Sequence, residues 1–515
     1  MNDSGRIVGR TLAEMADDDF DAARFAQAFA RFLDRFREAL PPPRNTLRRL
    51  VTEHLGEDPS ELPTYTEQFH VSEHANLQLA LDALLGDVSE WRLLGLPAEL
   101  QHYGEFSLAS MLGGRFHGST EPCAPEFVNV PVDVDRTLPC VRLGVYLLTY
   151  SDVPLVAMVG LREGHGPRPG LFLDVVAADA DHASRFVSRM RELMHQHNVY
   201  RGKVLSFSFT EWGDFGIAFH RLPAIGRDDI VLPDADIRAI ERHTIGMSEH
   251  GDVLRAAGRH LKRGLLLYGP PGAGKTLSVM YLCGQMPGRT TLLLSGPGAG
   301  ALGRAAAIAR SLQPAMVVLE DVDLVAAERS MPGIGTNPLL FQLLNEMDGL
   351  AEDADVVFVL TTNRVDLLEP ALAARPGRID QAVEIRLPDS HCRRRLLELY
   401  LRGIDHDEEL DEIVTRAEGT TASFMKELCR RAVLEAAESR TTGASDALRL
   451  TRRHLETALA DLLDHSPPVL RSSLGANPHL AETAPLESSA VPAPGTVSGW
   501  VAFGTSSAVS SYDDE

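Results

Sequence analysis

The chain has 515 residues, 44% of them hydrophobic and 24% charged, which is typical of a globular protein with room for two to four domains. Its net charge of −22 argues against general binding to nucleic acid or to an anionic membrane. There is no signal pattern at the N-terminus, and no apolar run approaches the roughly 18 residues of a membrane span. We therefore expect a cytoplasmic protein without a membrane span.

The first 230 residues contain no recognisable catalytic motif. Phenylalanines at helical spacing between residues 17 and 40 predict a helical segment within residues 1–60. Residues 61–230 are rich in short apolar runs, interrupted by one long helical pattern, and predict a separate α+β domain. We expect residues 1–230 to contact a protein client or partner, but their sequence does not identify it.

A phosphate-binding loop follows the apolar run at residues 265–268. The pattern G-x-x-x-x-G-K-[ST] is met by Gly269, Pro270, Pro271, Gly272, Ala273, Gly274, Lys275 and Thr276. We expect these residues and Leu277, where the next helix begins, to bind the nucleotide. Backbone N–H groups of such a loop surround phosphate oxygens at a helix N-terminus. We expect Lys275 to neutralise the β- and γ-phosphates of ATP and Thr276 to bind Mg²⁺. The chain has only four lysines among its 50 basic residues, so chance is a poor explanation for Lys275.

An acidic pair follows the next apolar strand, over residues 314–319. Glu320 and Asp321 are placed as nucleotide hydrolysis requires, with one carboxylate contacting Mg²⁺ and the other activating the attacking water. A third strand, over residues 356–360, leads to Asn363, whose amide could bind the γ-phosphate or the water. Arg375 and Arg378 beside a turn are suited to phosphate, although a lone arginine there would more commonly form a surface salt bridge.

The second half of the chain has the pattern of an α/β fold. Strands alternate with helices over residues 237–390, which predicts a parallel sheet covered by helices. Helical patterns over residues 391–465 predict a small lid. Residues 466–515 are rich in Pro, Ser, Ala and Gly and predict a disordered tail.

The order of these motifs resembles the AAA family of ATPases. The resemblance covers roughly residues 237–465 and rests on the phosphate loop, Glu320-Asp321, the segments 343–349 and 361–363, and Arg375 to Arg378. It implies a P-loop nucleotide hydrolase (AAA+) core with a helical lid, assembled into a homo-oligomeric ring, usually of six subunits. It also implies that Asn363 senses the γ-phosphate and that Arg375 and Arg378 reach into the neighbouring subunit's site.

The sequence departs from the family at three places. Most members have Asp-Glu where this chain has Glu320-Asp321, so the resemblance assigns the metal to Glu320 and catalysis to Asp321. The same inversion occurs in the mitochondrial branch that moves a folded Rieske protein. The loop 296–303 lacks the aromatic residue with which threading relatives grip a client, and Leu302 is its only large side chain. Ala422-Ser423 replaces the usual Gly-Ala near the nucleotide.

Three functions remain open on this basis. The first is an ATP-hydrolysing ring that remodels, unfolds or moves a protein client. The second is a slow nucleotide-dependent scaffold or regulatory switch, which the inverted acidic pair and the loop without an aromatic would suit. The third, an ATPase acting on nucleic acid, is disfavoured by the acidic charge. We favour the first because the set of hydrolysis residues is complete.

Overall fold

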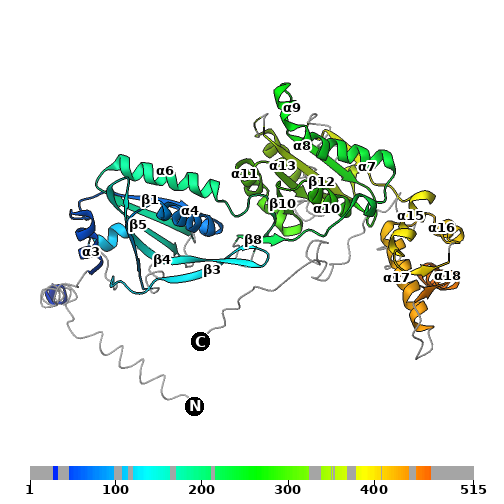
Figure 1. Cartoon of the computed structure of the whole chain (residues 1–515), viewed down its shortest axis with the longest axis horizontal. Helices are drawn as coiled ribbons and strands as arrows, with labels where there is room; N and C mark the ends of the chain where they lie inside the picture. The colour runs from blue at the N-terminus through cyan, green and yellow to red at the C-terminus, as the bar shows by residue number, and fades with distance from the viewer. Residues whose placement is uncertain are drawn as a thin grey trace, which may run out of the picture. The chain divides into compact units, whose positions relative to one another are not determined.

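A computed structural model describes residues 27–32, 46–97, 107–113, 120–162, 170–209, 215–323, 338–349, 351, 354–367, 378–407, 409–439 and 448–465. Contacts divide the chain into an N-terminal unit, Met1–Val128 with Pro139–Leu193, and a C-terminal unit, Asn129–Leu138 with Met194–Glu515 (Figure 1). The predicted tail, most of the predicted N-terminal helical segment and Arg375 lie outside the described residues. Across the described ranges, no helix combines the length and apolar character that a bilayer crossing needs.

The N-terminal unit is built on a sheet with helices, as the sequence predicted. Its strands are β1 (Thr64–Phe69), β2 (Trp91–Gly95), β3 (Glu126–Asp133), β4 (Arg136–Tyr150), β5 (Val153–Arg162) and β6 (Gly170–Ala177). Their order is β1-β6-β5-β4-β2, with β3 also beside β4. The helices are α3 (Thr46–Leu55), α4 (His74–Gly86), α5 (Leu108–Leu112) and α6 (Ala180–Gln196). Apolar residues of α3 and α5 pack with β4, β5 and β6 in one buried core.

The C-terminal unit contains a seven-stranded sheet of order β13-β9-β12-β11-β10-β7-β8. The strands are β7 (Val204–Phe209), β8 (Phe215–His220), β9 (Arg263–Tyr268), β10 (Thr290–Leu294), β11 (Ala315–Leu319), β12 (Val356–Thr362) and β13 (Gln381–Glu384). All neighbours run parallel except β7 and β8. Every residue of β10, β11 and β12 is buried, as expected for strands covered on both faces. The predicted α/β parallel-sheet core is confirmed.

Helices cover both faces of this sheet (Figure 1). They are α7 (Asp234–Glu241), the short turns α8 (Met247–Glu249) and α9 (Gly251–Ala256), α10 (Lys275–Gln285), α11 (Leu302–Ser311) and α13 (Pro338–Asp348). One buried cluster joins α11 and α13 to the sheet, and a second joins α7 and α10 to it. The carboxyl ends of the parallel strands therefore lie at one edge, where connecting loops can converge.

Strands β7 and β8 belong to the C-terminal sheet, which differs from the domain boundary expected near residue 230. Leu205 of β7 lies in register with Leu292 of β10, and the N–H of Thr291 donates to the Lys203 carbonyl at 2.9 Å. Leu205 and Phe207 are buried in the same core as β10, β11 and β12. The sequence of a short apolar strand does not show which sheet it joins. The prediction therefore grouped this hairpin with the strands that precede it in the chain.

The tip between β3 and β4 also belongs to the C-terminal unit. Asp133 forms an ion pair with Lys203 at 2.5 Å, and Asp135 forms one with Arg221 at 2.5 Å. Lys203 precedes β7 and Arg221 follows β8, so both pairs fall at the same end of the β7–β8 hairpin. These ion pairs hold residues 129–138 against the β7–β8 hairpin.

A helical lid follows β13. Its helices are α15 (Ser390–Tyr400), α16 (Asp411–Arg416), α17 (Ala422–Glu438) and α18 (Arg452–Ala460), with a two-stranded ladder of β14 (Asp405–His406) and β15 (Arg449–Leu450). Side-chain caps fix two helix starts, because Asp389 accepts from the Cys392 N–H and Thr421 accepts from the Phe424 N–H. The lid has its own buried core.

Candidate nucleotide site

The phosphate loop occupies the turn between β9 and α10. Gly269, Gly272 and Gly274 all have positive φ, at 147°, 74° and 113°, and Gly274 is the N-cap of α10. A Cβ on Gly269 would lie 2.1 Å from the Ile385 carbonyl oxygen, so no larger residue fits there. Glycine is therefore required at position 269 both by the backbone angles and by the close approach of Ile385, the residue that follows β13. The loop amides are left at the helix N-terminus, where anions bind.

Lys275 lies in the mouth of this loop with only 7% of its surface exposed. Its Nζ donates to the carbonyl oxygens of Gly269 and Pro270 at 2.8 and 2.9 Å, and to Oδ1 of Asn363 at 2.8 Å. An ammonium group has three donors, and these contacts use all three. Burial lowers the pKa of Lys275, while the nearby carboxylates, Asp321 first among them, raise it.

The acidic pair lies at the end of β11. Glu320 is buried, with 4% exposed, and its N–H donates to the Leu294 carbonyl at 2.9 Å. Asp321 has φ of 48°, a left-handed conformation that aspartate tolerates better than most residues. Its N–H donates to Oγ1 of Thr361 at 3.0 Å. Although the two residues are adjacent in sequence, their environments differ, because Glu320 is buried and Asp321 is half-buried.

Asp321 also contacts the end of β12. Nδ2 of Asn363 donates to Oδ1 of Asp321 at 3.3 Å, so the Asn363 amide bridges Asp321 and Lys275. Burial raises the pKa of Asp321, and the Asp323 charge raises it further, while Lys275 and Asn363 lower it. A carboxylate with a raised pKa is a better proton acceptor, which suits a general base.

Asp323 is a site residue that was not among the ligands and catalytic groups expected from the sequence. Its Oδ1 accepts from Oγ1 of Thr362 at 2.8 Å and from the N–H of Asn363 at 3.0 Å. These two bonds fix the backbone that carries the Asn363 amide. The sequence signal was its place two residues after Asp321, at the end of a buried strand.

The remaining predicted ligands lie at the same edge of the sheet. Thr276 is half-buried in the first turn of α10, and Leu277 beside it is exposed. A threonine hydroxyl and the Glu320 carboxylate supply the hard oxygen ligands that Mg²⁺ prefers. The structure thus brings Lys275, Thr276, Glu320, Asp321 and Asn363 to the carboxyl ends of β9, β11 and β12, although they are far apart in sequence.

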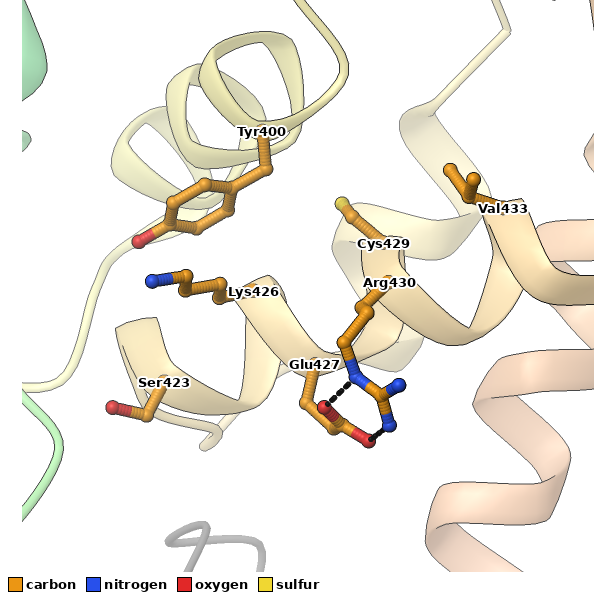
Figure 2. A pocket seen from close by; sticks show the side chains of 7 residues that line it. All are labelled: Tyr400, Ser423, Lys426, Glu427, Cys429, Arg430 and Val433. Carbon is orange, nitrogen blue, oxygen red and sulfur yellow. Dashed lines mark hydrogen bonds and ion pairs between the residues drawn. The ribbon is translucent and has the colours of Figure 1, made fainter. Parts of the chain in front are cut away.

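The lid closes one side of the loop. The Ser423 N–H donates to the Gly272 carbonyl at 3.1 Å, and a Cβ on Gly272 would lie 3.0 Å from Oγ of Ser423. A groove of about 420 Å³ begins there. It is lined by Tyr400, Ser423, Lys426, Glu427, Cys429, Arg430 and Val433 (Figure 2). Tyr400 and Lys426 point into it from α15 and α17, and neither was predicted as a site residue.

Arg378 lies elsewhere. It forms an ion pair with Asp348, the last residue of α13. Two residues later, the Asp380 N–H donates to the Gly264 carbonyl at 2.8 Å, close to where β9 begins. The phosphate loop follows the other end of β9, so Arg378 is at the opposite edge of the sheet from the Lys275 of its own chain.

The loop after β10 is packed onto the hairpin that extends the sheet. Residues Gly296–Ala301 form a 3-10 turn, η5, that contacts β7. Leu302, predicted to be the one large side chain available to this loop, is 0% exposed in a core that includes Leu205 and Phe207. It is not accessible to a client in this structure.

A parallel sheet with a phosphate loop, an acidic pair and a polar residue at successive carboxyl ends defines a P-loop nucleoside triphosphatase. Residues 265–387 match the family described as "ATPase family associated with various cellular activities (AAA)". These residues form an AAA ATPase domain, as the resemblance indicated.

Curated relatives agree with this assignment. The chain is 36% identical over 198 residues to "ATP-dependent zinc metalloprotease FtsH 2" of Sphaerobacter thermophilus, covering 36% of this chain and 30% of the relative. It is 32% identical over 234 residues to "Cell division cycle protein 48 homolog" of Archaeoglobus fulgidus, covering 41% and 32%. It is 33% identical over 198 residues to "26S proteasome regulatory subunit 6A" of Encephalitozoon cuniculi, covering 36% and 49%. Each match spans less than half of the relative.

Proposed function

We propose that this chain forms an ATP-hydrolysing ring that remodels, unfolds or moves a protein client. The observation that carries the proposal is the convergence of Lys275 and Asp321 on Asn363, to which both are hydrogen-bonded at the edge where a nucleotide would bind. Two of the relatives are named as a metalloprotease and a proteasome subunit, which supports a protein as the client.

The site residues divide the work of hydrolysis as follows. The loop amides of residues 269–274 and the Lys275 ammonium bind the β- and γ-phosphates of ATP. Thr276 and Glu320 hold Mg²⁺, which neutralises phosphate charge when bound. Asp321 accepts a proton from the attacking water, and the Asn363 amide orients the water or the γ-phosphate.

The groove of Figure 2 is the place for the base of the nucleotide. It begins at Ser423, which is hydrogen-bonded to the phosphate loop at Gly272, and the Tyr400 ring forms part of its wall. An aromatic wall with a few polar groups suits a purine ring. This groove and the loop together would hold one nucleotide along its length.

The ring is proposed to be a homo-oligomer, usually of six subunits in the family that this chain resembles. Arg375 would donate to the nucleotide of a neighbouring subunit. The resemblance gives the same role to Arg378, which in this structure is bound to Asp348.

Client contact is proposed to rest mainly on residues 1–230. A loop that grips an extended chain needs exposed bulky side chains. Leu302 is buried and η5 is packed against β7, so the loop offers no such side chain among its described residues. This arrangement favours docking or moving a folded client over threading an unfolded one.

A slow nucleotide-dependent switch is the second candidate. The shorter Asp321 side chain in the catalytic position and the packed loop after β10 both favour it. It predicts slow ATP turnover that candidate clients do not change. An ATPase acting on nucleic acid is less favoured because the chain carries a net charge of −22.

A pull-down with Asp321→Asn tests the favoured function. In ATP this variant should retain nucleotide and hold the client on an ATP-locked ring, whereas Lys275→Ala, which cannot bind ATP, should release it. Clients recovered equally by both variants, or a wild-type turnover rate that no recovered client alters, would favour the switch instead.

A further inference from the structure

Thr361 is a buried threonine near the end of β12, beside the acidic pair. Only 1% of its surface is exposed, and its Oγ1 accepts a hydrogen bond from the Asp321 N–H at 3.0 Å. Along β12 it alternates with Val357 and Val359, which pack on the face of the sheet that α7 and α10 cover. Thr361 therefore shares a face with the helix that begins at the phosphate loop.

The hydrogen bond to Thr361 takes the place of the next backbone bond between β11 and β12. The two strands are parallel, with Ala315 in register with Val356, and the Ala315 N–H donates to the Asp355 carbonyl at 3.0 Å. The same offset, continued past the end of β11, would direct the Asp321 N–H to the carbonyl of Thr361. The N–H donates instead to the hydroxyl of that residue. The threonine side chain thus replaces its own carbonyl as the acceptor where the ladder ends.

The chain turns away from the sheet at Asp321. Its φ of 48° lies in the left-handed region, which residues other than glycine adopt rarely and keep only where their surroundings hold them. Because this conformation breaks the alternation of side chains along a strand, it decides where a side chain as short as aspartate can reach. Oδ1 of Asp321 accepts from Nδ2 of Asn363 at 3.3 Å. Asp321 is therefore held by Thr361 at its backbone and by Asn363 at its carboxylate.

We propose that Thr361 is a positioning residue for hydrolysis. Its hydroxyl ends the ladder at Asp321, holds that residue in the left-handed conformation and so aims its carboxylate at the Asn363 amide and the attacking water. Thr361 acts only through Asp321, which is the group that accepts the proton. The inference rests on the proposed function, because it takes Asp321 as the general base.

Thr361→Val tests the proposal, because it removes the hydroxyl and keeps the branched shape of the side chain. We expect turnover to fall on the order of 10²-fold, the cost of a misplaced catalytic group. KM for ATP and the Mg²⁺ dependence should be unchanged, because Lys275, Thr276 and Glu320 are untouched. Thr361→Ser keeps the acceptor and should retain most of the turnover.

The pH profile gives a second readout. Turnover should rise with pH through the pKa of Asp321, which must be ionised to accept a proton. Burial and the Asp323 charge raise this pKa, while the Lys275 charge and the Asn363 hydrogen bond lower it. Thr361→Val weakens the bond from Asn363, so the acid limb of the profile should move to higher pH.

Thr290→Val is the matched control. Thr290 is a fully buried threonine at the start of β10, and its Oγ1 accepts from the Gly202 N–H at 3.0 Å, the same kind of bond at the same length. It lies at the opposite edge of the sheet from the acidic pair. Thr290→Val should lower the melting temperature at least as much as Thr361→Val, and leave turnover by the folded protein and its pH profile unchanged.

Other results would overturn the inference. A merely structural role predicts that Thr361→Val behaves as the control does, with a lower melting temperature but wild-type turnover and pH profile. A Thr361→Ser protein as inactive as Thr361→Val would show that the hydroxyl is not what matters. If Thr361→Val does not fold, Thr361→Ser and Thr361→Ala make the same comparison, with turnover retained only in the first.

Hydrogen exchange separates this inference from the proposed function. If the wild type hydrolyses no ATP, the proposed function fails, but the bond to Thr361 can still be measured. Exchange of the Asp321 amide should be slow in wild type and Thr361→Ser, and faster in Thr361→Val. Equal exchange in the three proteins would mean that the hydroxyl does not hold this residue.

Discussion

The Lys275 ammonium donates a 2.8 Å hydrogen bond to the Asn363 amide oxygen, and the same amide donates to Asp321 through its nitrogen. The phosphate-binding cation, the candidate sensor and the candidate base are therefore linked without a nucleotide. A γ-phosphate entering the loop competes for the Lys275 proton that Asn363 now accepts. Binding of ATP would free the Asn363 amide to change its partner. The hydrogen bonds at the end of β12 would then depend on whether ATP is bound.

Lys275→Ala is expected to reduce ATP binding and turnover by roughly 10²–10³-fold or more, because the phosphates lose their buried cation. Turnover can be followed by phosphate release and binding by calorimetry. Lys203→Ala, which removes the lysine paired with Asp133, is the matched control and should keep full nucleotide affinity. Equal turnover in Lys275→Ala and wild type would show that the site is elsewhere.

The two members of the acidic pair should give different defects. Glu320→Gln is expected to raise the Mg²⁺ concentration needed for turnover, because a metal ligand is lost. Asp321→Asn is expected to bind ATP normally and lose roughly 10²–10⁴-fold in turnover, because the water loses its proton acceptor. Mg²⁺ titrations of binding and turnover distinguish the two. The roles would be exchanged if Asp321→Asn shifted the Mg²⁺ dependence and Glu320→Gln did not.

The raised pKa of Asp321 predicts a pH-dependent stability in the absence of nucleotide. The folded protein holds this proton more tightly than the unfolded chain, whose aspartate has a pKa near 3.8. Its contribution to stability is therefore present below that value and is lost as the pH rises through the folded pKa. Asn cannot ionise, so Asp321→Asn should unfold at higher urea than wild type at neutral pH. That advantage should shrink as the pH falls toward 4. A difference that is constant over this range, or larger in acid, would contradict the assignment.

Leu302→Ala should behave as a core substitution. We expect it to lower the free energy of unfolding by about 2–5 kcal/mol, as for other buried leucines. Leu434→Ala on α17, where the side chain is 51% exposed, is the control and should cost far less. A companion assay follows ATP-driven unfolding of a tagged, stable fluorescent domain, which we expect to be weak. Robust unfolding by wild type that Leu302→Ala abolishes without loss of stability would mean that this loop grips the client.

The ring can be tested by mixing subunits. Arg375→Ala and Lys275→Ala should each be inactive alone. Mixed together, they should regain some turnover, because some interfaces then pair an intact loop with an intact arginine. Sedimentation of the mixture confirms assembly. An active monomer, or a mixture that assembles but stays inactive, would argue against donation between subunits.

The local parts of the site could be predicted from sequence, and their long-range contacts could not. The phosphate loop carries its own backbone requirements in Gly269, Gly272 and Gly274, and a polar residue after a buried strand marks an edge of the sheet. Which carboxylate fixes Asn363 depends on the register of β11 and β12, so Asp323 was overlooked as a contact. The burial of Leu302 depends on β7, whose sheet no local pattern reveals.

The pairing of β7 with β10 has a practical consequence for any attempt to study the ATPase alone. A fragment that begins at residue 237, where the family resemblance starts, would omit both strands of the hairpin. The open edge of β10 would then expose unpaired backbone groups at Thr291, Leu292 and Leu293, which favours strand-to-strand association between fragments. Soluble expression should require a start before Tyr200, whose ring is buried in the same core.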